Sequence, residues 1–173
     1  MEIYMRKYTA LFCCLFLLTL LAQVGYAQSQ EVKNIHAGFR GVPWGITASE
    51  AKSYGLSNII DGIGGVKYCI RENENLSLGD VQLSYIQYHF VRGKFYEVEI
   101  VSVPRTEAGL YAECLKLFGE KSVDFSYRGE PGKYEWYLSD VTVTGYFTSI
   151  GSREHERIVI IKNDRPQHTG GGL

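Results

Sequence analysis

The sequence has little of several things that define specialised protein classes. Of its 173 residues, four are cysteine, four are proline and two are methionine. Its longest apolar run, 10–22, has about 13 residues, short of the roughly 20 that a membrane-spanning helix needs. Basic and acidic side chains are nearly balanced, at 18 and 19, so neither nucleic acid nor an anionic membrane surface is an expected partner.

The first 27 residues have the three parts of a secretory signal. Arg6 and Lys7 precede the apolar run, and the small residues Gly25 and Ala27 follow it at the positions that a signal peptidase recognises. We therefore expect 1–27 to be removed on export to the periplasm or the medium. The alternative is an uncleaved N-terminal anchor, because no charge interrupts the apolar stretch.

Removal of the signal leaves 146 of the 173 residues, with 16 basic and 18 acidic side chains. A chain of this size can bury roughly 70% of its unfolded surface, so it can fold as one domain without a metal or a disulfide. We expect a flexible lead-in at 28–37, a single domain at 38–162 and a disordered tail at 163–173, where three consecutive glycines occur.

Two of the four cysteines leave with the signal, and Cys69 and Cys114 remain. In an oxidising compartment they could form a disulfide. Against this, Val66, Tyr68 and Ile70 alternate as one apolar strand face and place Cys69 on the other, whereas Cys114 belongs to an apolar helix stripe. The pattern leaves both the bonded and the free state open.

The periodicity predicts an α+β fold, in which two helices pack on one face of a largely antiparallel sheet. Thr47-Ala48-Ser49-Glu50 has the spacing of a capping box, and Gly55 would end that helix; the second helix would end at Gly119. Strands are predicted at 66–71, 81–91, 94–103, 123–128, 133–138, 141–148 and 156–162.

Two similar turns suggest a duplicated helix-plus-hairpins unit. Leu78-Gly79-Asp80-Val81 and Leu138-Ser139-Asp140-Val141 match in type, and each enters a predicted strand. The alternative is one irregular α+β domain that uses similar turns twice.

The second and third strands predict a hairpin with the three-residue loop Val91-Arg92-Gly93. This register places Tyr88 opposite Tyr96 and makes that face apolar. The opposite, mixed face would then carry Tyr85, His89 and Phe95.

No motif for a nucleophile elbow, a phosphate loop, a dinucleotide site or a zinc protease occurs in the chain. The four histidines lack the paired spacing of metal ligands, so we expect neither a metal nor a cofactor. Dispersed acid and base residues remain an alternative, and His89, Glu97 and Glu99 are the first candidates for a hydrolase-type activity.

Aromatic residues are the positive signal, since 18 remain after the signal is removed. Most should fill the core, and packing could account for all of them. We hypothesise that the others bind a protein, a peptide or an envelope component, and that the chain is a binding protein or an inhibitor of a secreted enzyme rather than an enzyme. The candidate binding residues are Trp44, Tyr85, His89, Phe95 and Tyr137.

Three segments resemble a loose group of small exported bacterial proteins of unassigned function. They are Phe39-Arg40-Gly41-Val42-Pro43-Trp44-Gly45, Leu78-Gly79-Asp80-Val81 and Tyr88-x-Phe90-x-x-Gly93-Lys94-Phe95-Tyr96. The resemblance covers most of 39–118 and implies a periplasmic setting. It implies no activity, because its glycines and aromatic residues are structural in kind.

Overall fold

The computed structural model describes residues 34–104, 109–124, 132–150 and 153–164. Within these residues the helical segments are η1 (Glu50–Tyr54), η2 (Ile63–Gly65) and α2 (Leu110–Phe118). The strands are β1 (Gly38–Phe39), β2 (Val42–Pro43), β3 (Leu56–Asp61), β4 (Val66–Arg71), β5 (Ser77–Leu78), β6 (Val81–Val91), β7 (Lys94–Ser102), β8 (Val123–Asp124), β9 (Lys133–Leu138), β10 (Val141–Ile150) and β11 (Arg153–Lys162). None of the described helices is long and apolar enough to cross a membrane.

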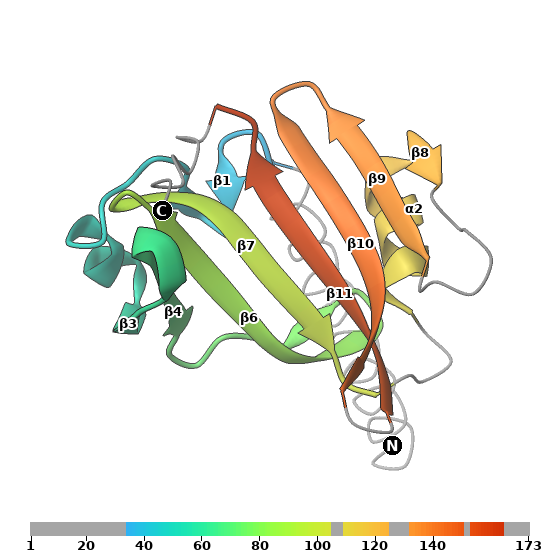
Figure 1. Cartoon of the computed structure of the whole chain (residues 1–173), viewed down its shortest axis with the longest axis horizontal. Helices are drawn as coiled ribbons and strands as arrows, with labels where there is room; N and C mark the ends of the chain where they lie inside the picture. The colour runs from blue at the N-terminus through green and yellow to red at the C-terminus, as the bar shows by residue number, and fades with distance from the viewer. Residues whose placement is uncertain (1–33, 105–108, 125–131, 151–152, 165–173) are drawn as a thin grey trace, which may run out of the picture.

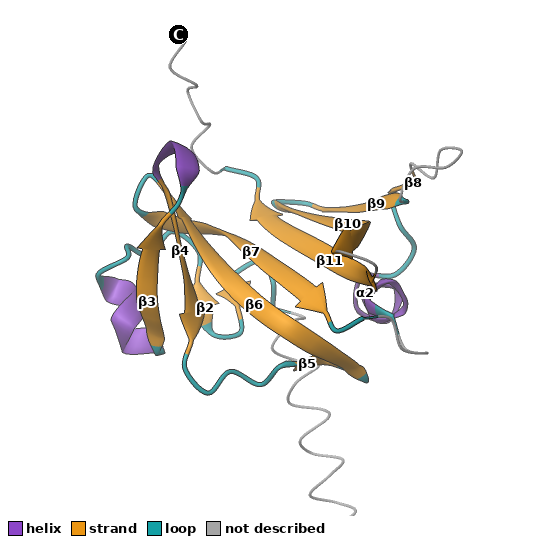
Figure 2. Cartoon of the chain, turned by 60° about the horizontal axis from the view of Figure 1, so that its bottom comes forward, coloured by secondary structure: helices purple, strands orange, loops and turns teal. Residues whose placement is uncertain are grey.

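One antiparallel sheet dominates the fold, with its strands in the order β3-β4-β6-β7-β11-β10-β9-β8. The strands of the first half run inward from one edge in chain order, and those of the second half run inward from the other edge. The last strands of the two halves, β7 and β11, therefore pair in the middle. Figure 1 shows β1 and α2 behind this sheet. Figure 2 shows η1 beside β3 at one end and α2 next to β11 at the other.

The expected pair of helices on one sheet face is wrong, because the fold is mostly β and α2 is the only α-helix among the described residues. The first segment, η1, is a five-residue 3₁₀ helix. Its capping box does form: the Thr47 N–H donates to Glu50 Oε2 at 2.8 Å, and the Glu50 N–H donates to Thr47 Oγ1 at 3.3 Å. Gly55 (φ 76°) then ends the segment too early for a stable α-helix. The suggested duplication also fails as a repeat of like helices, because the two segments differ in type and length.

The strand predictions are mostly confirmed, with 66–71, 81–91 and 133–138 at their predicted bounds. The pattern does not predict β3, because the polar residues Ser57 and Asn58 interrupt its apolar alternation. Asn58 has a φ of 53°, and the pairing of β3 with β4 shifts register between Ser57 and Ile60. The strand therefore contains a β-bulge. The predicted strand 123–128 is described only as far as Asp124, and its remainder lies outside the described residues.

The register predicted for the β6–β7 hairpin is also wrong. Its loop is the two-residue turn Arg92-Gly93, in which both residues have positive φ (51° and 77°), as a type I′ turn requires. Tyr96 is then the extra residue of a β-bulge in β7, so Phe95 faces the core instead of sharing a face with His89. The observed pairs are Phe90 with Phe95, His89 with Glu97, Tyr88 with Val98, and Ile86 with Ile100.

The motif at 39–45 builds the core. Phe39 is fully buried and meets the Tyr88 ring edge-on, with 6.1 Å between centroids. Trp44 stacks on Phe95 at 4.6 Å between centroids, and its indole N–H donates to the Ile35 carbonyl at 2.7 Å. Because Ile35 is itself buried, the end of the expected lead-in 28–37 packs into the fold.

Arg40 in the same motif forms a buried ion pair. It donates to Glu74 Oε1 at 2.8 Å and to the Asn75 carbonyl at 2.6 Å. The Tyr88 hydroxyl donates to the other oxygen of Glu74 at 2.7 Å. These hydrogen bonds satisfy the Glu74 carboxylate and connect the β1–β2 hairpin to the loop before β5, as a buried charge pair requires.

Cys69 and Cys114 are free thiols, so the disulfide considered for them does not form in the structure. Both are buried, Cys69 in β4 and Cys114 in α2. Burial raises the pKa of the Cys69 thiol to about 11, and burial together with the carboxylates of Glu156 and Glu113 raises that of Cys114. Neither thiol is an activated nucleophile.

Replacement of Phe95 tests whether this side chain supports the core or binds a ligand. Because Phe95 is fully buried against Trp44 and Tyr88, Phe95→Ala should lower the free energy of unfolding by about 3–5 kcal/mol. Ile63→Ala is the control: this side chain is 98% exposed, so its loss should cost less than about 0.5 kcal/mol. Denaturant unfolding measures both, and equal effects would contradict the core assignment.

Candidate functional site

The sheet has one face packed against β1, β2, η1 and α2 and one face that no described element covers. We call the second the open face. Pairing of adjacent strands arranges its residues in three rows across the sheet. The rows are Tyr68, His89, Glu97, Ile161, Thr142 and Tyr137; then Gln87, Glu99, Val159, Thr144 and Glu135; then Tyr85, Val101, Arg157, Tyr146 and Lys133.

Glu99 is the centre of a polar network in the middle of the open face. Its Oε1 accepts a hydrogen bond from the Tyr85 hydroxyl at 2.9 Å, and its Oε2 accepts one from Arg157 Nη2 at 3.0 Å. Two donors, one of them charged, compensate the desolvation of this carboxylate, which is only 9% exposed. His89 lies beside it, with Nδ1 2.9 Å from Glu97 Oε1.

A second network lies toward β9. Lys133 Nζ is 2.6 Å from Glu135 Oε1, and the Tyr137 hydroxyl donates to Glu135 Oε2. Hydrogen bonds from Lys133 and Tyr137 hold the pKa of the Glu135 carboxyl below its usual value. The Tyr146 ring connects the two networks, because the charged ends of Arg157 and Lys133 lie 5.9 and 6.0 Å from its centroid.

The β3–β4 end of the open face is apolar. Ile60 is paired with Tyr68, and Ile70 follows Tyr68 by two residues, so all three share this face. Ile60 is 50% exposed and Ile70 is 45% exposed, and Ile63, in the η2 turn that joins the two strands, is 98% exposed. We call Ile60, Ile63 and Ile70 the isoleucine edge. Tyr68 connects it to the polar network, since its ring lies 6.2 Å from the His89 ring.

Three of the five candidate binding residues lie on the same face of the sheet, although Tyr137 on β9 is four strands away from Tyr85 and His89 on β6. Tyr85, His89 and Tyr137 lie on the open face, and Tyr137 is 55% exposed. Trp44 and Phe95 instead stack on each other on the core side. The β7 bulge turns the Phe95 side chain to the core side. Trp44 is held on that side by the hydrogen bond from its indole N–H to the Ile35 carbonyl.

Sequence reasoning missed several members of this site, including Lys133, Glu135 and Tyr146. A signal for two of them was present, because Lys133, Glu135 and Tyr137 alternate along one strand. This alternation does not reveal the strand order. Only the strand order shows that these β9 side chains lie on the same face as those of β6.

The alternative acid and base residues His89, Glu97 and Glu99 are neighbours, as a proton-transfer site would require. They do not line either of the cavities described below. The described residues also contain no group of three His, Cys, Asp or Glu side chains that could hold a metal ion. The open face presents charged and aromatic side chains that are held by hydrogen bonds across strands.

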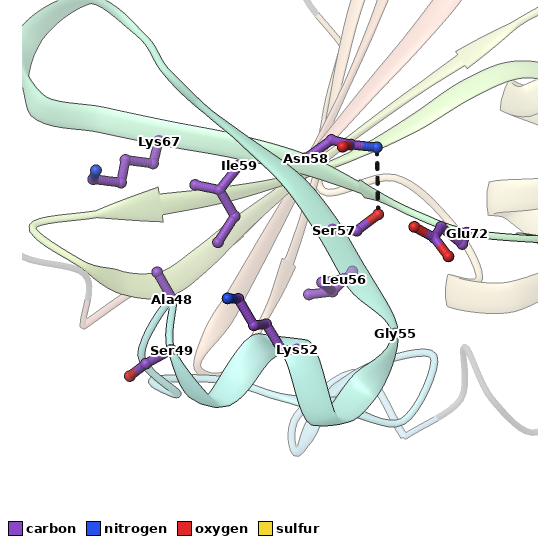
Figure 3. Close-up of a pocket in the computed structure, with 10 residues that line it drawn as sticks. All are labelled: Ala48, Ser49, Lys52, Gly55, Leu56, Ser57, Asn58, Ile59, Lys67 and Glu72. Carbon is purple, nitrogen blue, oxygen red and sulfur yellow. Dashed lines mark hydrogen bonds between the residues drawn. The ribbon is translucent and has the colours of Figure 1, made fainter.

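The larger cavity is a groove of about 750 Å³ between η1 and β3 (Figure 3). Leu56 and Ile59 of β3 are among its apolar lining residues. Lys52 of η1 and Lys67 of β4 also line it, and Figure 3 shows the Lys52 side chain directed from η1 toward β3. The smaller cavity is a crevice of about 10 Å³ that includes Tyr111 of α2. The groove is therefore the one of the two with room for a ligand.

The Tyr85–Glu99 hydrogen bond can be tested by titration. Burial, reinforced by the Glu99 carboxylate, raises the pKa of the Tyr85 phenol from 10.0 to about 12. Glu99→Gln should lower this pKa without returning it to 10.0, because burial remains its largest cause. Since the unfolded chain loses this proton first, the free energy of unfolding should fall as the pH rises from about 10 to about 12.

Ring-labelled tyrosine followed by NMR against pH measures the Tyr85 phenol directly. Glu97→Gln is the matched control, because it removes a nearby carboxylate and leaves the Tyr85–Glu99 hydrogen bond in place. A Tyr85 phenol that ionises at or below its ordinary pKa in the unaltered protein would contradict the network.

Comparison with known proteins adds no assignment to these residues. No protein-family model, curated protein or solved structure matches the chain. The likeness to small exported bacterial proteins therefore stays a prediction, and function must follow from the chemistry of the open face and the groove.

Proposed function

We propose that the protein is exported and acts by binding another protein or a peptide through the open face of its sheet. The observation that carries this proposal is the isoleucine edge, which adjoins the ordered network around Glu99 and His89. An apolar patch rimmed by polar groups is the usual composition of a recognition surface.

The isoleucine edge supports binding because the exposure of its side chains to water does not stabilise the fold. Ile60, Ile63 and Ile70 are each at least 45% exposed, whereas Leu83, Ile86, Ile100, Ile158 and Ile160 of β6, β7 and β11 are buried. Isolated exposed apolar residues are common on protein surfaces, but Ile60, Tyr68 and Ile70 are neighbours on one face of the β3–β4 hairpin. Burial under a partner would remove this apolar surface from water.

The polar network supports binding for a different reason. Cross-strand hydrogen bonds hold Tyr85, Glu99 and Arg157 in one arrangement before any partner arrives. These side chains then lose less conformational entropy when a partner docks than mobile side chains would. The tyrosines add large contact areas with a polar end, as in many protein interfaces.

Inhibition of a secreted enzyme is the second candidate function, and Ile63 favours it. This side chain is almost fully exposed at the tip of the β3–β4 hairpin, between Gly62 and Gly64. A projecting apolar residue on a narrow turn has the shape to enter the cleft of another protein. In that case the partner is an enzyme, and Ile63→Asp would restore its activity.

Site-specific photo-crosslinking in the producing cell tests the proposal. A photoreactive residue at position 60 or 70 should capture one and the same partner, and a residue at Ala112, exposed on α2, should not. The purified partner should bind the unaltered protein about tenfold more tightly than it binds Ile70→Asp, because a charge would enter an apolar contact. Ala112→Asp is the matched control for this substitution.

Two outcomes would overturn the proposal. One is crosslinking at position 112 equal to that at 60 and 70. The other is equal affinity of the purified partner for Ile70→Asp and the unaltered protein. Circular dichroism and thermal unfolding confirm that each variant is folded, which is expected because Ile70 is 45% exposed.

A further inference from the structure

We infer that the groove between η1 and β3 is a second binding site, which takes an extended peptide segment that pairs with β3 and carries an acidic side chain. The groove is separate from the open face. Its lining includes Lys52 of η1 and Leu56 of β3, and it includes no residue of the Glu99 network. The inference therefore stands or falls independently of the proposed function.

The first support is the position of β3 at the end of the sheet. β3 pairs with β4 on one side, and no other described strand pairs with its outer side. An edge strand presents unpaired backbone N–H and C=O groups at alternate residues, and an extended peptide can bond to them. At this edge the groove supplies space, about 750 Å³, beside the strand (Figure 3).

The bulge at Asn58 limits how such a segment could pair. A bulge usually protects an edge strand from long, nonspecific pairing, because it twists the edge away from an approaching strand. Here the irregularity lies between Ser57 and Ile60, within a strand of six residues. It favours a short segment held by side-chain pockets over a long strand, and so favours sequence-specific binding over aggregation.

The side chains around the groove indicate which peptide fits. Ala48 and Ile59 provide apolar contacts, and Figure 3 shows Lys52 on the η1 side of the groove. Within an extended segment, residues two apart point to the same side. The expected ligand therefore has an aliphatic residue and an acidic residue at positions i and i+2.

Charge selects the acidic residue. The groove is lined by two lysines, Lys52 and Lys67, and one carboxylate, Glu72. Lys67 is already paired with Asp61 at 2.7 Å. Lys52 is exposed and has no ion pair among the described residues, so its ammonium can meet a ligand carboxylate. A salt bridge at this exposed site contributes modestly to affinity but discriminates against a basic peptide.

A phage-displayed library of random octapeptides is the probe that tests the inference. Selection on the purified protein should enrich peptides with an aliphatic residue two positions from Asp or Glu. The most enriched peptide, made synthetically, should bind the unaltered protein about tenfold more tightly than it binds Lys52→Glu. Lys94→Glu, which reverses an exposed charge outside the groove, is the matched control and should retain binding.

Two further measurements test strand pairing itself. N-methylation of the peptide at alternate amides should weaken binding about tenfold at the positions that face β3, because each blocks a backbone hydrogen bond. Chemical-shift changes of the labelled protein should centre on the amides of residues 55–60. Both substituted lysines are exposed, so thermal unfolding should show folded variants.

Several results would overturn the inference. They are equal enrichment on Lys52→Glu, no effect of N-methylation at any position, and shift changes centred on the open face. Dimerisation of the protein through the same β3 amides would assign the edge to a second copy instead and would also overturn it. Failure of the open-face proposal differs from all of these, because Ile70→Asp should leave peptide binding unchanged.

Discussion

The pairing of β7 with β11 is the interaction on which the rest of the structure depends. It joins the two halves of the sheet through the register that sets Glu99 opposite Val159 and Ile100 opposite Ile158. On the core side this register places aliphatic residues of both halves in one cluster. On the open face it brings Arg157 of the second half within 3.0 Å of Glu99 of the first. A one-residue slip would move the side chains of one strand to the opposite face and would separate Arg157 from Glu99.

The open face and the groove are consequences of how the sheet is covered. The β1–β2 hairpin, through Phe39 and its neighbour Trp44, packs on the core side, and α2 does the same at the other end through Leu110. On the open face, polar side chains of neighbouring strands satisfy one another's hydrogen-bonding groups. The groove arises where η1 is too short to cover β3 and a bulge bends the strand.

The difference between the predicted and observed site comes mainly from one residue. A two-residue turn at Arg92-Gly93 and an extra residue at Tyr96 move Phe95 from the mixed face to the core. Alternation along β7 could not show this, because a bulge changes the period at one position without a distinctive residue type. His89 and Tyr85 lie before the bulge and keep their predicted face. The capping box at Thr47 and the end at Gly55 were also predicted correctly, but the segment between them is a 3₁₀ helix and not one of a pair of helices packed on the sheet.

Local patterns determined most strand bounds and the polar character of one face of β6, because both depend on the period of the side chains. They also determined the ends of the helical segments at Gly55 and Gly119, because these ends depend on the backbone freedom of glycine. The sequence by itself also indicated tyrosine and histidine as candidate binding residues. Only the tertiary structure decided that Trp44 and Phe95 stabilise the core, that Cys69 and Cys114 are free, and that Glu135 and Arg157 belong to the open face. Those outcomes depend on which strands are neighbours and in what register, and such long-range pairing follows from the packing of the whole sheet rather than from any one segment.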